Sequence, residues 1–212
     1  MQIVLATNNK GKIREIKKML PDDIEVLSLK DVNFNDEIVE DGNTFFENAL
    51  KKAYTVCKKT NMITISDDSG LCVDALGGKP GIYSARYSNT GNDLENTKKV
   101  LREMKGKKDR KAHFMCSIVV YFPNDTYKSY EGKMEGLIID ELKGENGFGY
   151  DPIFYLPEYK MTSAEISMEE KNKISHRAIA IRKMVLDLKN MWRWESEARW
   201  GFKTTISRWI NW

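Results

Sequence analysis

The chain has 212 residues, of which 41% are hydrophobic and 31% charged, a composition that suits one well-cored domain with or without two lobes. Its formal charge is +3, and because the last 22 residues carry four basic and two acidic side chains, the preceding 190 are at about +1, too little for a general nucleic-acid-binding surface. The spacing of the three cysteines indicates neither a disulfide framework nor a zinc site. No apolar run approaches the ~20 residues that span a bilayer, so membrane insertion is not indicated either. We therefore expect a cytoplasmic protein.

The first part of the chain alternates strand-like and helix-like segments. Thr44, with Glu47 three residues later, forms a capping-box pattern, which predicts that a helix begins there. Before it, the hydrophobic pattern predicts a strand over 2–6, a loop over 7–12, an amphipathic helix over 13–20, a strand over 24–29 and a polar loop over 31–42.

A short strand, ITISDDSGL at 63–71, follows that helix. Its apolar, β-branched start is typical of a strand, and Asp67, Asp68, Ser69 and Gly70 stand where we expect the strand to end. An Asx-type turn explains these residues without any function. A site built at the end of the strand explains them as ligands or bases.

The later elements include a hairpin. A Gly- and Pro-rich stretch at 77–87 leads to a polar helix near 93–105, and residues 112–122 and 127–139 predict two long strands joined by a tight turn. Strands interleaved with helices, followed by a hairpin, predict an α/β fold with a mixed β-sheet flanked by helices.

The segment 169–188 predicts a terminal helix with an apolar stripe. On one continuous helix, Lys171 and His176 would point about 140° apart at 3.6 residues per turn. We therefore expect a break, with Ser175 capping the last helix and Lys171 in the preceding loop or short turn. The start of a helix is where we expect His176 and Arg177. They could lie on the protein surface or belong to a functional site.

The loop TNNKGK at 7–12 suits an anion, because Lys10 and Lys12 lie beside the free amides of a helix start. It lacks the glycine spacing and the Lys-Ser/Thr ending of a P-loop. A solvated turn explains the loop equally well.

Three carboxylates favour a metal. Glu40 could converge with Asp67 and Asp68 at one edge of the sheet, and oxygen-only ligands favour Mg²⁺, which bridges to substrate phosphates. A carboxylate beside Mg²⁺ could also orient or deprotonate a water for attack on phosphorus. Lysines combined with such acids indicate a polyphosphate substrate.

The stretch GFGYDPIF at 147–154 suits a nucleobase. It places Phe148 and Tyr150 between glycines and before Asp151, and an aromatic ring on such a loop can stack on a purine. A turn whose aromatic rings fill the core explains the same pattern.

Five ordered motifs resemble those of the inosine/xanthosine triphosphate pyrophosphatases, from about Met1 to Asn190. They are TNNKGK, DDSGL, GGKPGIYSARY, GFGYDPIF, and EEK followed by SHR. The resemblance implies hydrolysis of ITP, dITP or XTP between the α and β phosphates, which gives the nucleoside monophosphate and pyrophosphate with Mg²⁺ as cofactor. It also implies an elongated two-lobed α/β domain over 1–190 and a homodimer.

The resemblance assigns roles to particular residues. Asp68 is the implied catalytic acid, Glu40 and Asp68 are the implied metal ligands, and Asp67 is expected to support rather than react. Asn8 stands where glycine is common in the family, and because Asn tolerates left-handed backbone we expect the turn to survive. The implied substrate-binding residues are Thr7, Asn8, Asn9, Lys10, Gly11, Lys12, Ser69, Phe148, Gly149, Tyr150, Asp151, Lys171, His176 and Arg177.

The base selectivity has a physical explanation. Hypoxanthine and xanthine present a carbonyl acceptor at position 6, whereas adenine presents an amino donor. Donors from Lys171, His176 or Arg177 aimed at that position would pair with the first two bases and be left unpaired by adenine. Guanine also carries the 6-carbonyl, so its rejection must involve its 2-amino group.

Two other functions stay open. A related house-cleaning pyrophosphatase for a pyrimidine or a modified nucleotide would share the chemistry without needing the His-Arg pair. A nucleotide- or nucleic-acid-binding module would use tryptophans for stacking, although the near-neutral body and the carboxylates argue against it. We expect no stable nucleic-acid partner and no membrane partner.

Residues 191–212 differ from the rest of the chain, because they hold all five tryptophans. One interpretation is an amphipathic extension that docks on a membrane surface, a partner or another subunit. The other is a non-native or read-through tail without a selected role. Nothing in this segment is typical of catalysis.

Overall fold

The α/β fold with a mixed sheet that the sequence predicts is confirmed. A computed structural model describes the backbone of residues 1–200 and the side chains of residues 1–191. The sheet has the strand order β2-β1-β3-β4-β5-β6-β7, parallel from β2 to β3 and antiparallel from β3 onward. Its strands are β1 (Gln2–Leu5), β2 (Glu25–Ser28), β3 (Thr64–Val73), β4 (Lys111–Tyr121), β5 (Tyr127–Ile138), β6 (Phe154–Leu156) and β7 (Met161–Thr162).

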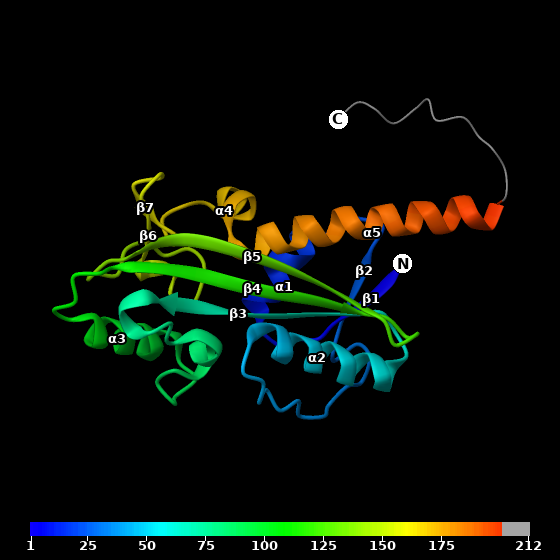
Figure 1. Cartoon of the computed structure of the whole chain (residues 1–212), viewed down its shortest axis with the longest axis horizontal. Helices are drawn as coiled ribbons and strands as arrows, with labels where there is room; N and C mark the ends of the chain where they lie inside the picture. Colours follow the sequence, from blue (N-terminus) through cyan, green and yellow to red (C-terminus); the bar gives the residue numbers. More distant parts are fainter. Residues whose placement is uncertain (201–212) are drawn as a thin grey trace.

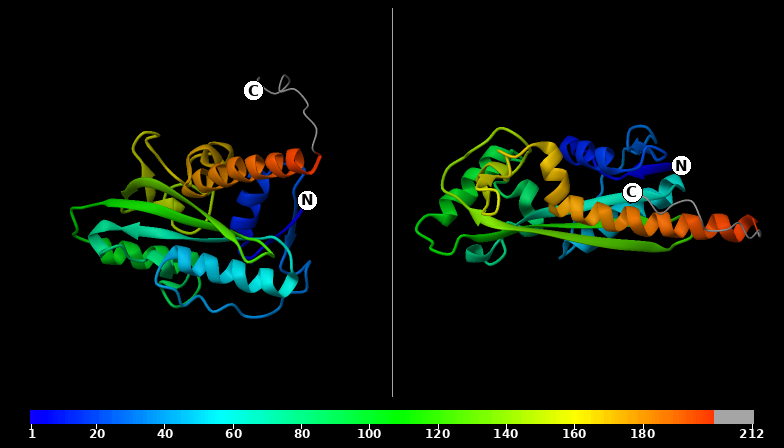
Figure 2. Two further views of the ribbon diagram at one scale, coloured as in Figure 1. Left: turned by 45° about the vertical axis from the view of Figure 1, so that its right-hand side comes forward. Right: turned by 90° about the horizontal axis from the view of Figure 1, so that it is seen from above.

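Helices cover both faces of this sheet. In two views α5 runs along one face beside β4 and β5, and α2 lies on the opposite face (Figure 1 and Figure 2). The α-helices are α1 (Lys10–Met19), α2 (Phe45–Thr60), α3 (Asp93–Met104), α4 (Met168–Ile174) and α5 (His176–Trp200), and the 3₁₀-helices are η1 (Asp74–Leu76), η2 (Gly81–Arg86) and η3 (Asp151–Ile153).

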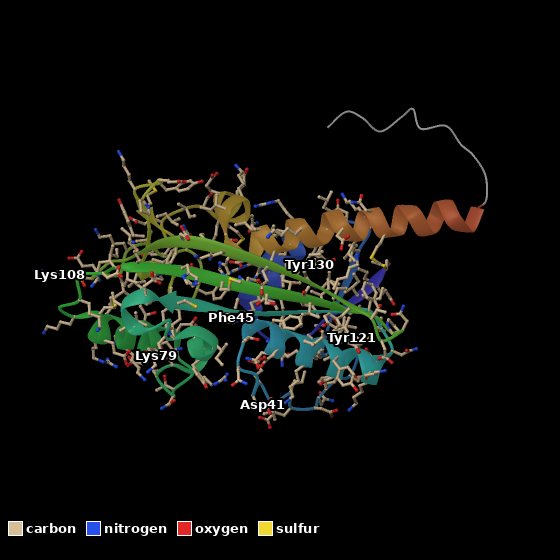
Figure 3. The ribbon with its side chains drawn as sticks, viewed as in Figure 1. Asp41, Phe45, Lys79, Lys108, Tyr121 and Tyr130 are labelled. Atoms are coloured by element: carbon tan, nitrogen blue, oxygen red, sulfur yellow. The ribbon has the colours of Figure 1, made fainter. Side chains whose placement is uncertain are left out.

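Side chains alternate between the two faces along each long strand. Ile118 of β4 packs into the core with α5, whereas Val119 packs into the core with α2. The two labelled tyrosines of Figure 3 show the same division: the Tyr130 hydroxyl donates to Asp187 of α5 at 2.7 Å, and the Tyr121 ring meets the ring of Tyr54 of α2 with centroids 5.5 Å apart.

The molecule is elongated because β3, β4 and β5 carry two separate cores (Figure 1). Cys116 and Ile118 of β4 belong to the core with α1 and α5. Ala112 and Phe114 of the same strand belong to a second core with α3 and β6. The predicted two-lobed shape is therefore confirmed, with the long strands common to both lobes.

The helix starts follow their capping signals. Asn9 caps α1 by accepting from Lys12 N at 3.1 Å, so the helix begins at Lys10, three residues before the prediction. Thr44 caps α2 by accepting from Glu47 N at 3.1 Å, and the Glu47 carboxylate accepts in turn from Asn43 N at 2.7 Å. The predicted start of α2 is confirmed.

The prediction that the strand at 63–71 ends at Asp67 is wrong. β3 continues to Val73 and pairs with β4 along its whole length, from Thr64 opposite Tyr121 to Val73 opposite Ala112. The partner strand lies about 50 residues away in sequence, so no local signal reveals this ladder. β1 pairs with β3 only at Thr64 and Ile65, and Asp67 therefore lies just beyond the end of β1.

Gly70 is required by a close approach rather than by a turn. A side-chain Cβ at this position would collide with the hydroxyl of Ser84 and the carbonyl of Gly81. η2 can therefore pack directly on β3.

The predicted break before the last helix is confirmed. α4 ends at Ile174, Ser175 is extended with ψ 154°, and its hydroxyl accepts from Ala178 N at 3.1 Å to cap α5. Lys171 lies in α4.

α5 continues past Asn190 to Trp200, so the helix crosses the expected boundary of the tryptophan-rich extension. Residues 201–212 of that extension lie outside the described residues, and both interpretations of its role stay predictions. In the part of the chain that the structure describes, none of the helices is long and apolar enough to cross a membrane.

Candidate active site

A cavity of about 200 Å³ opens between the lobes, where β1 ends beside β3. It collects side chains from the loop before α1, from β3, from η2, from the loop before η3 and from the start of α5. Of the predicted site residues, those that line it are Thr7, Asn9, Lys12, Glu40, Asp68, Ser69, Phe148, Gly149, Tyr150, Asp151, Lys171, His176 and Arg177.

Three predicted residues do not line the cavity: Asn8, Lys10 and Gly11. A Cβ on Gly11 would lie 2.7 Å from the Phe148 ring, so the absence of a side chain at this position allows the ring to pack against α1. The turn survives with Asn8 in place of glycine, as expected, and it does so without left-handed backbone, since Asn8 is not among the described residues with positive φ. The side chain of Asn9 closes the turn by capping α1.

Lys52 of α2 holds the two predicted metal ligands together. Its ammonium lies 3.0 Å from the Glu40 carboxylate and 3.5 Å from that of Asp68, and it donates to the Asp67 carbonyl at 2.9 Å. Asn48 donates to the other Asp68 oxygen at 3.2 Å. Two carboxylates thus surround one cation at the wall of the cavity.

Burial shifts the proton equilibria of this group. It raises the pKa of Asp68, even though Lys52 and Lys12 oppose the shift. Burial alone would lower the pKa of Lys52, but the Asp68 and Glu40 carboxylates raise it overall. Lys52 therefore remains a cation, and Asp68 is a stronger base than an exposed aspartate.

Asp67 points to the opposite face of β3 and is fully buried. Its carboxylate accepts from Arg177 Nε at 2.8 Å and lies 2.5 Å from the Lys12 ammonium. Ser69 and the Cys116 thiol also donate to it, at 3.0 and 3.1 Å. Burial would raise the pKa of Asp67, but Arg177 and Lys12 together hold it well below its usual value. Such a group supports its neighbours and is a poor base.

Arg177 extends this contact into a network. Its Nη1 donates to Glu15 of α1, and its Nη2 donates to Ser69 at 2.8 Å. Lys171 lies 3.2 Å from Glu15 and 2.6 Å from Asp151. Each guanidinium nitrogen therefore already donates to a protein group, which differs from the expectation that this fork faces a purine.

His176 is buried beside this network. Its ring stacks on Phe114 with centroids 4.9 Å apart and 12° between the planes, and its Nδ1 has no hydrogen-bond partner. Burial, reinforced by the charge of Arg177, lowers the pKa of His176 well below its usual value. The imidazole is therefore neutral at physiological pH.

The two predicted stacking rings have different surroundings. Phe148 lies at the cavity, with the Lys171 ammonium 5.1 Å and the Arg177 guanidinium 5.7 Å from its ring centre. Tyr150 belongs to the second core, and its hydroxyl donates to Ser84 O at 2.7 Å. The core-filling alternative therefore describes Tyr150, and Phe148 is the ring available for stacking.

Sequence reasoning missed Lys52, Asn48 and Glu15. Lys52 lies three residues after Ala49 and four before Val56, on the buried stripe of α2, so a charge within an apolar stripe was the available signal. Asn48 lies one turn before Lys52 on the same face. Glu15 is buried beside Ile16 in α1, and nothing in its local sequence separates it from a solvated glutamate.

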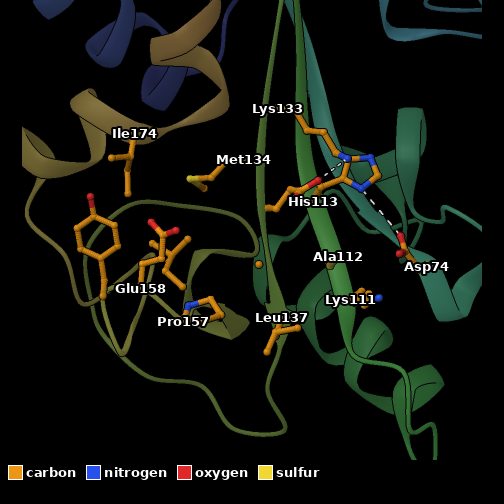
Figure 4. Close-up of a pocket in the computed structure, with 14 residues that line it drawn as sticks. Asp74, Lys111, Ala112, His113, Lys133, Met134, Leu137, Pro157, Glu158 and Ile174 are labelled. Carbon is orange, nitrogen blue, oxygen red and sulfur yellow. Dashed lines mark hydrogen bonds and ion pairs between the residues drawn. The ribbon is translucent and has the colours of Figure 1, made fainter.

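A larger hollow of about 900 Å³ lies in the second lobe and contains none of the predicted site residues (Figure 4). His113 and Asp74 border one side, with a closest nitrogen–oxygen distance of 3.9 Å. Tyr159 and Ile174 border another. Because the larger hollow contains none of the predicted site residues and the smaller cavity contains most of them, the smaller cavity is the better candidate active site.

Comparisons with known proteins show which family the chain resembles. The model of the Ham1 family matches residues 3–186. A dITP/XTP pyrophosphatase of Bacillus licheniformis is 51% identical over 187 residues, 86% of this chain and 95% of the relative, and that of Bacillus subtilis is 48% identical over 86% and 94%. The structure of the Staphylococcus aureus Ham1 protein superimposes with a TM-score of 0.83 at 42% identity, covering 90% of this chain and all of that one.

Replacing Arg177 by Ala is expected to lower the free energy of unfolding by about 3–5 kcal/mol, because the buried carboxylates of Asp67 and Glu15 would lose the guanidinium that they share. Urea denaturation measures this loss. Arg182→Ala, five residues further along α5 and exposed, is the control and should change stability by less than about 0.5 kcal/mol. A loss below about 1 kcal/mol for Arg177→Ala would contradict the network.

Stability should also depend on His176 between about pH 7 and pH 5. The lowered pKa of the folded state means that only the unfolded state takes up a proton as the pH falls through the ordinary value of 6.5, so the parent loses up to about 1.4 kcal/mol per pH unit. His176→Phe keeps the stacking ring and removes this proton. Parallel denaturation curves should show the parent losing stability relative to His176→Phe in this range, and a constant difference would refute a neutral, buried imidazole.

Proposed function

The chain belongs to the Ham1 family, and from that membership and the geometry of the site we propose that it hydrolyses the non-canonical purine nucleoside triphosphates dITP, ITP and XTP to the nucleoside monophosphate and pyrophosphate. The observation that carries the proposal is the cavity itself. The carboxylates of Glu40 and Asp68, the start of α1 and the ring of Phe148 all line it. The relatives named dITP/XTP pyrophosphatases favour a purine substrate over the pyrimidine alternative. The same relatives argue against a binding module.

The phosphates fit the start of α1. Thr7, Asn9 and Lys12, around the start of α1, line the cavity. The first backbone amides of a helix have no partner within the helix. Helix starts bind anions through such amides and the helix dipole. Lys12 is also paired with Asp67, and this ion pair holds the loop against β3.

Asp68 is the proposed general base. It accepts a proton from a water whose oxygen forms a bond to the α phosphorus, while the bond from that phosphorus to the bridging oxygen breaks and pyrophosphate leaves. Because burial raises its pKa, the carboxylate is a more effective proton acceptor than an exposed aspartate. Asn48 and Lys52 fix its orientation from the side of α2.

Mg²⁺ is the proposed cofactor, held by Glu40 and Asp68. The fit rests on the structure: both carboxylates already surround one positive charge, that of Lys52, and both are hard oxygen donors. Within the described residues no group of three or more histidine, cysteine or acidic side chains could hold a metal alone, which suits an ion that takes its other ligands from phosphates and water. When bound, Mg²⁺ would neutralise charge on the phosphates.

The base is proposed to stack on Phe148. Asp151 accepts from Phe148 N at 2.8 Å, and α3 holds the next residue through Asp93, which accepts from Gly149 N at 3.0 Å. The platform is therefore rigid. Recognition of the 6-carbonyl by Lys171 and His176 stays a prediction, as do the homodimer and the cytoplasmic location.

Asp68→Asn should keep the fold but lower kcat for ITP by more than tenfold, because the amide retains the shape and loses the basic oxygen. Release of pyrophosphate measures turnover, and circular dichroism checks the fold. Asp41→Asn, an exposed carboxylate on the same loop as Glu40, is the matched control and should retain the parent rate. If Asp68→Asn kept more than a tenth of the parent kcat, corresponding to a loss below ~1.4 kcal/mol, another base would be required.

Activity should require Mg²⁺. Excess chelator should abolish ITP hydrolysis, added Mg²⁺ should restore it, and Zn²⁺ at the same free concentration should not, because the proposed ligands are hard oxygens. Full turnover in excess chelator would rule out the metal assignment.

A further inference from the structure

Arg86 occupies a distinct position among the residues of the cavity. It is the last residue of η2 and lines the cavity beside the Glu40 loop, with 45% of its side chain exposed. Its guanidinium stacks over the Tyr83 ring at 5.2 Å from the centroid, which orients the side chain without using its hydrogen-bond donors. The donors thus remain close to solvent at the edge of the site.

The backbone that carries Arg86 is firmly held. The Ser84 hydroxyl accepts from Leu71 N of β3 at 2.9 Å and donates to Gly81 O at 2.6 Å. Tyr150 donates to Ser84 O at 2.7 Å, and Asn96 of α3 donates to the next carbonyl at 3.1 Å. Four hydrogen bonds therefore fix a segment that itself contributes only one charged side chain to the cavity.

The other cations that line the cavity are already closely paired. The ammonium of Lys12 lies 2.5 Å from Asp67, that of Lys171 lies 2.6 Å from Asp151, and Arg177 is 2.8 Å from Asp67. Lys52 is held 3.0 Å from its nearest carboxylate. Arg86 differs, because its closest approach to the Glu40 carboxylate is 3.9 Å and its direct hydrogen bond goes to the Glu40 carbonyl at 3.3 Å.

A series of side-chain contacts connects Arg86 to Asp68 along the cavity. Arg86 approaches Glu40, Glu40 pairs with Lys52, and Lys52 pairs with Asp68. A nucleotide whose base stacks on Phe148 and whose α phosphate lies at Asp68 would extend its outer phosphates toward Glu40 and Arg86. An arginine fork is well suited to a terminal phosphate, since it offers several donors in one plane.

We infer that Arg86 binds the terminal phosphate of the substrate and so selects triphosphates over diphosphates. The inference rests on the proposed function. Arg86, at the end of η2, would contact the leaving pyrophosphate from the side of the Glu40 loop.

The test compares ITP with IDP, which lacks the terminal phosphate, at saturating Mg²⁺ and with IMP formation measured by chromatography. Arg86→Gln should lower kcat/KM for ITP by about 10- to 100-fold, the usual effect of losing a hydrogen bond to a charged group, and change that for IDP by less than about threefold. Arg86→Lys, which keeps the charge without the fork, should fall between. IDP is also measured as a competitive inhibitor, so its affinity is obtained even where its turnover is slow.

Arg102→Gln, which removes an exposed charge from α3 outside the cavity, is the matched control and should leave both substrates unaffected. Thermal melting of each variant checks η2, and Arg86→Lys carries the test if Arg86→Gln melts early. An equal decrease for ITP and IDP, or no decrease for ITP, would overturn the inference. If the parent forms no IMP from ITP, the proposed function fails instead.

Discussion

The buried contact between Asp67 and Arg177 is the interaction on which the site depends. The two residues are 110 positions apart, and both side chains are almost inaccessible. A buried charge is strongly unfavourable unless it is paired, so α5 must begin where its second residue reaches β3. Glu15 and Lys171 extend the pair to α1 and α4, and through Asp151 to the Phe148 loop. One network thus fixes the phosphate loop, the strand and the aromatic platform relative to one another.

Because side chains alternate along β3, the adjacent residues Asp67 and Asp68 point to opposite faces of the sheet and have different roles. Asp67 points into the network, where two cations lower its pKa and make it a structural anion. Asp68 points the other way, toward α2, where burial raises its pKa and Lys52 aligns it with Glu40. Two neighbouring carboxylates coexist because the strand separates them and each has its own cation.

Local signals in the sequence predicted the local structure. The cap at Thr44, the hairpin at residues 112–139 and the break at Ser175 depend on neighbouring residues, and the structure has all three. The continuation of β3 past Asp67 depends on pairing with a distant strand, so the strand was predicted to end too early. Lys52 and Glu15 were missed for the same reason, since their partners lie on other elements. The five ordered motifs brought most of the predicted residues to one cavity, but they did not reveal that Arg177 is held by carboxylates.

In the proposed reaction, Asp68 directs a water to the α phosphorus and the outer phosphates leave together as pyrophosphate. Hydrolysis of ITP in water enriched in ¹⁸O, followed by mass spectrometry of both products, shows which phosphorus is attacked. Attack at the α phosphorus puts one ¹⁸O atom in the nucleoside monophosphate and none in pyrophosphate. Label in pyrophosphate, or release of orthophosphate in its place, would contradict it.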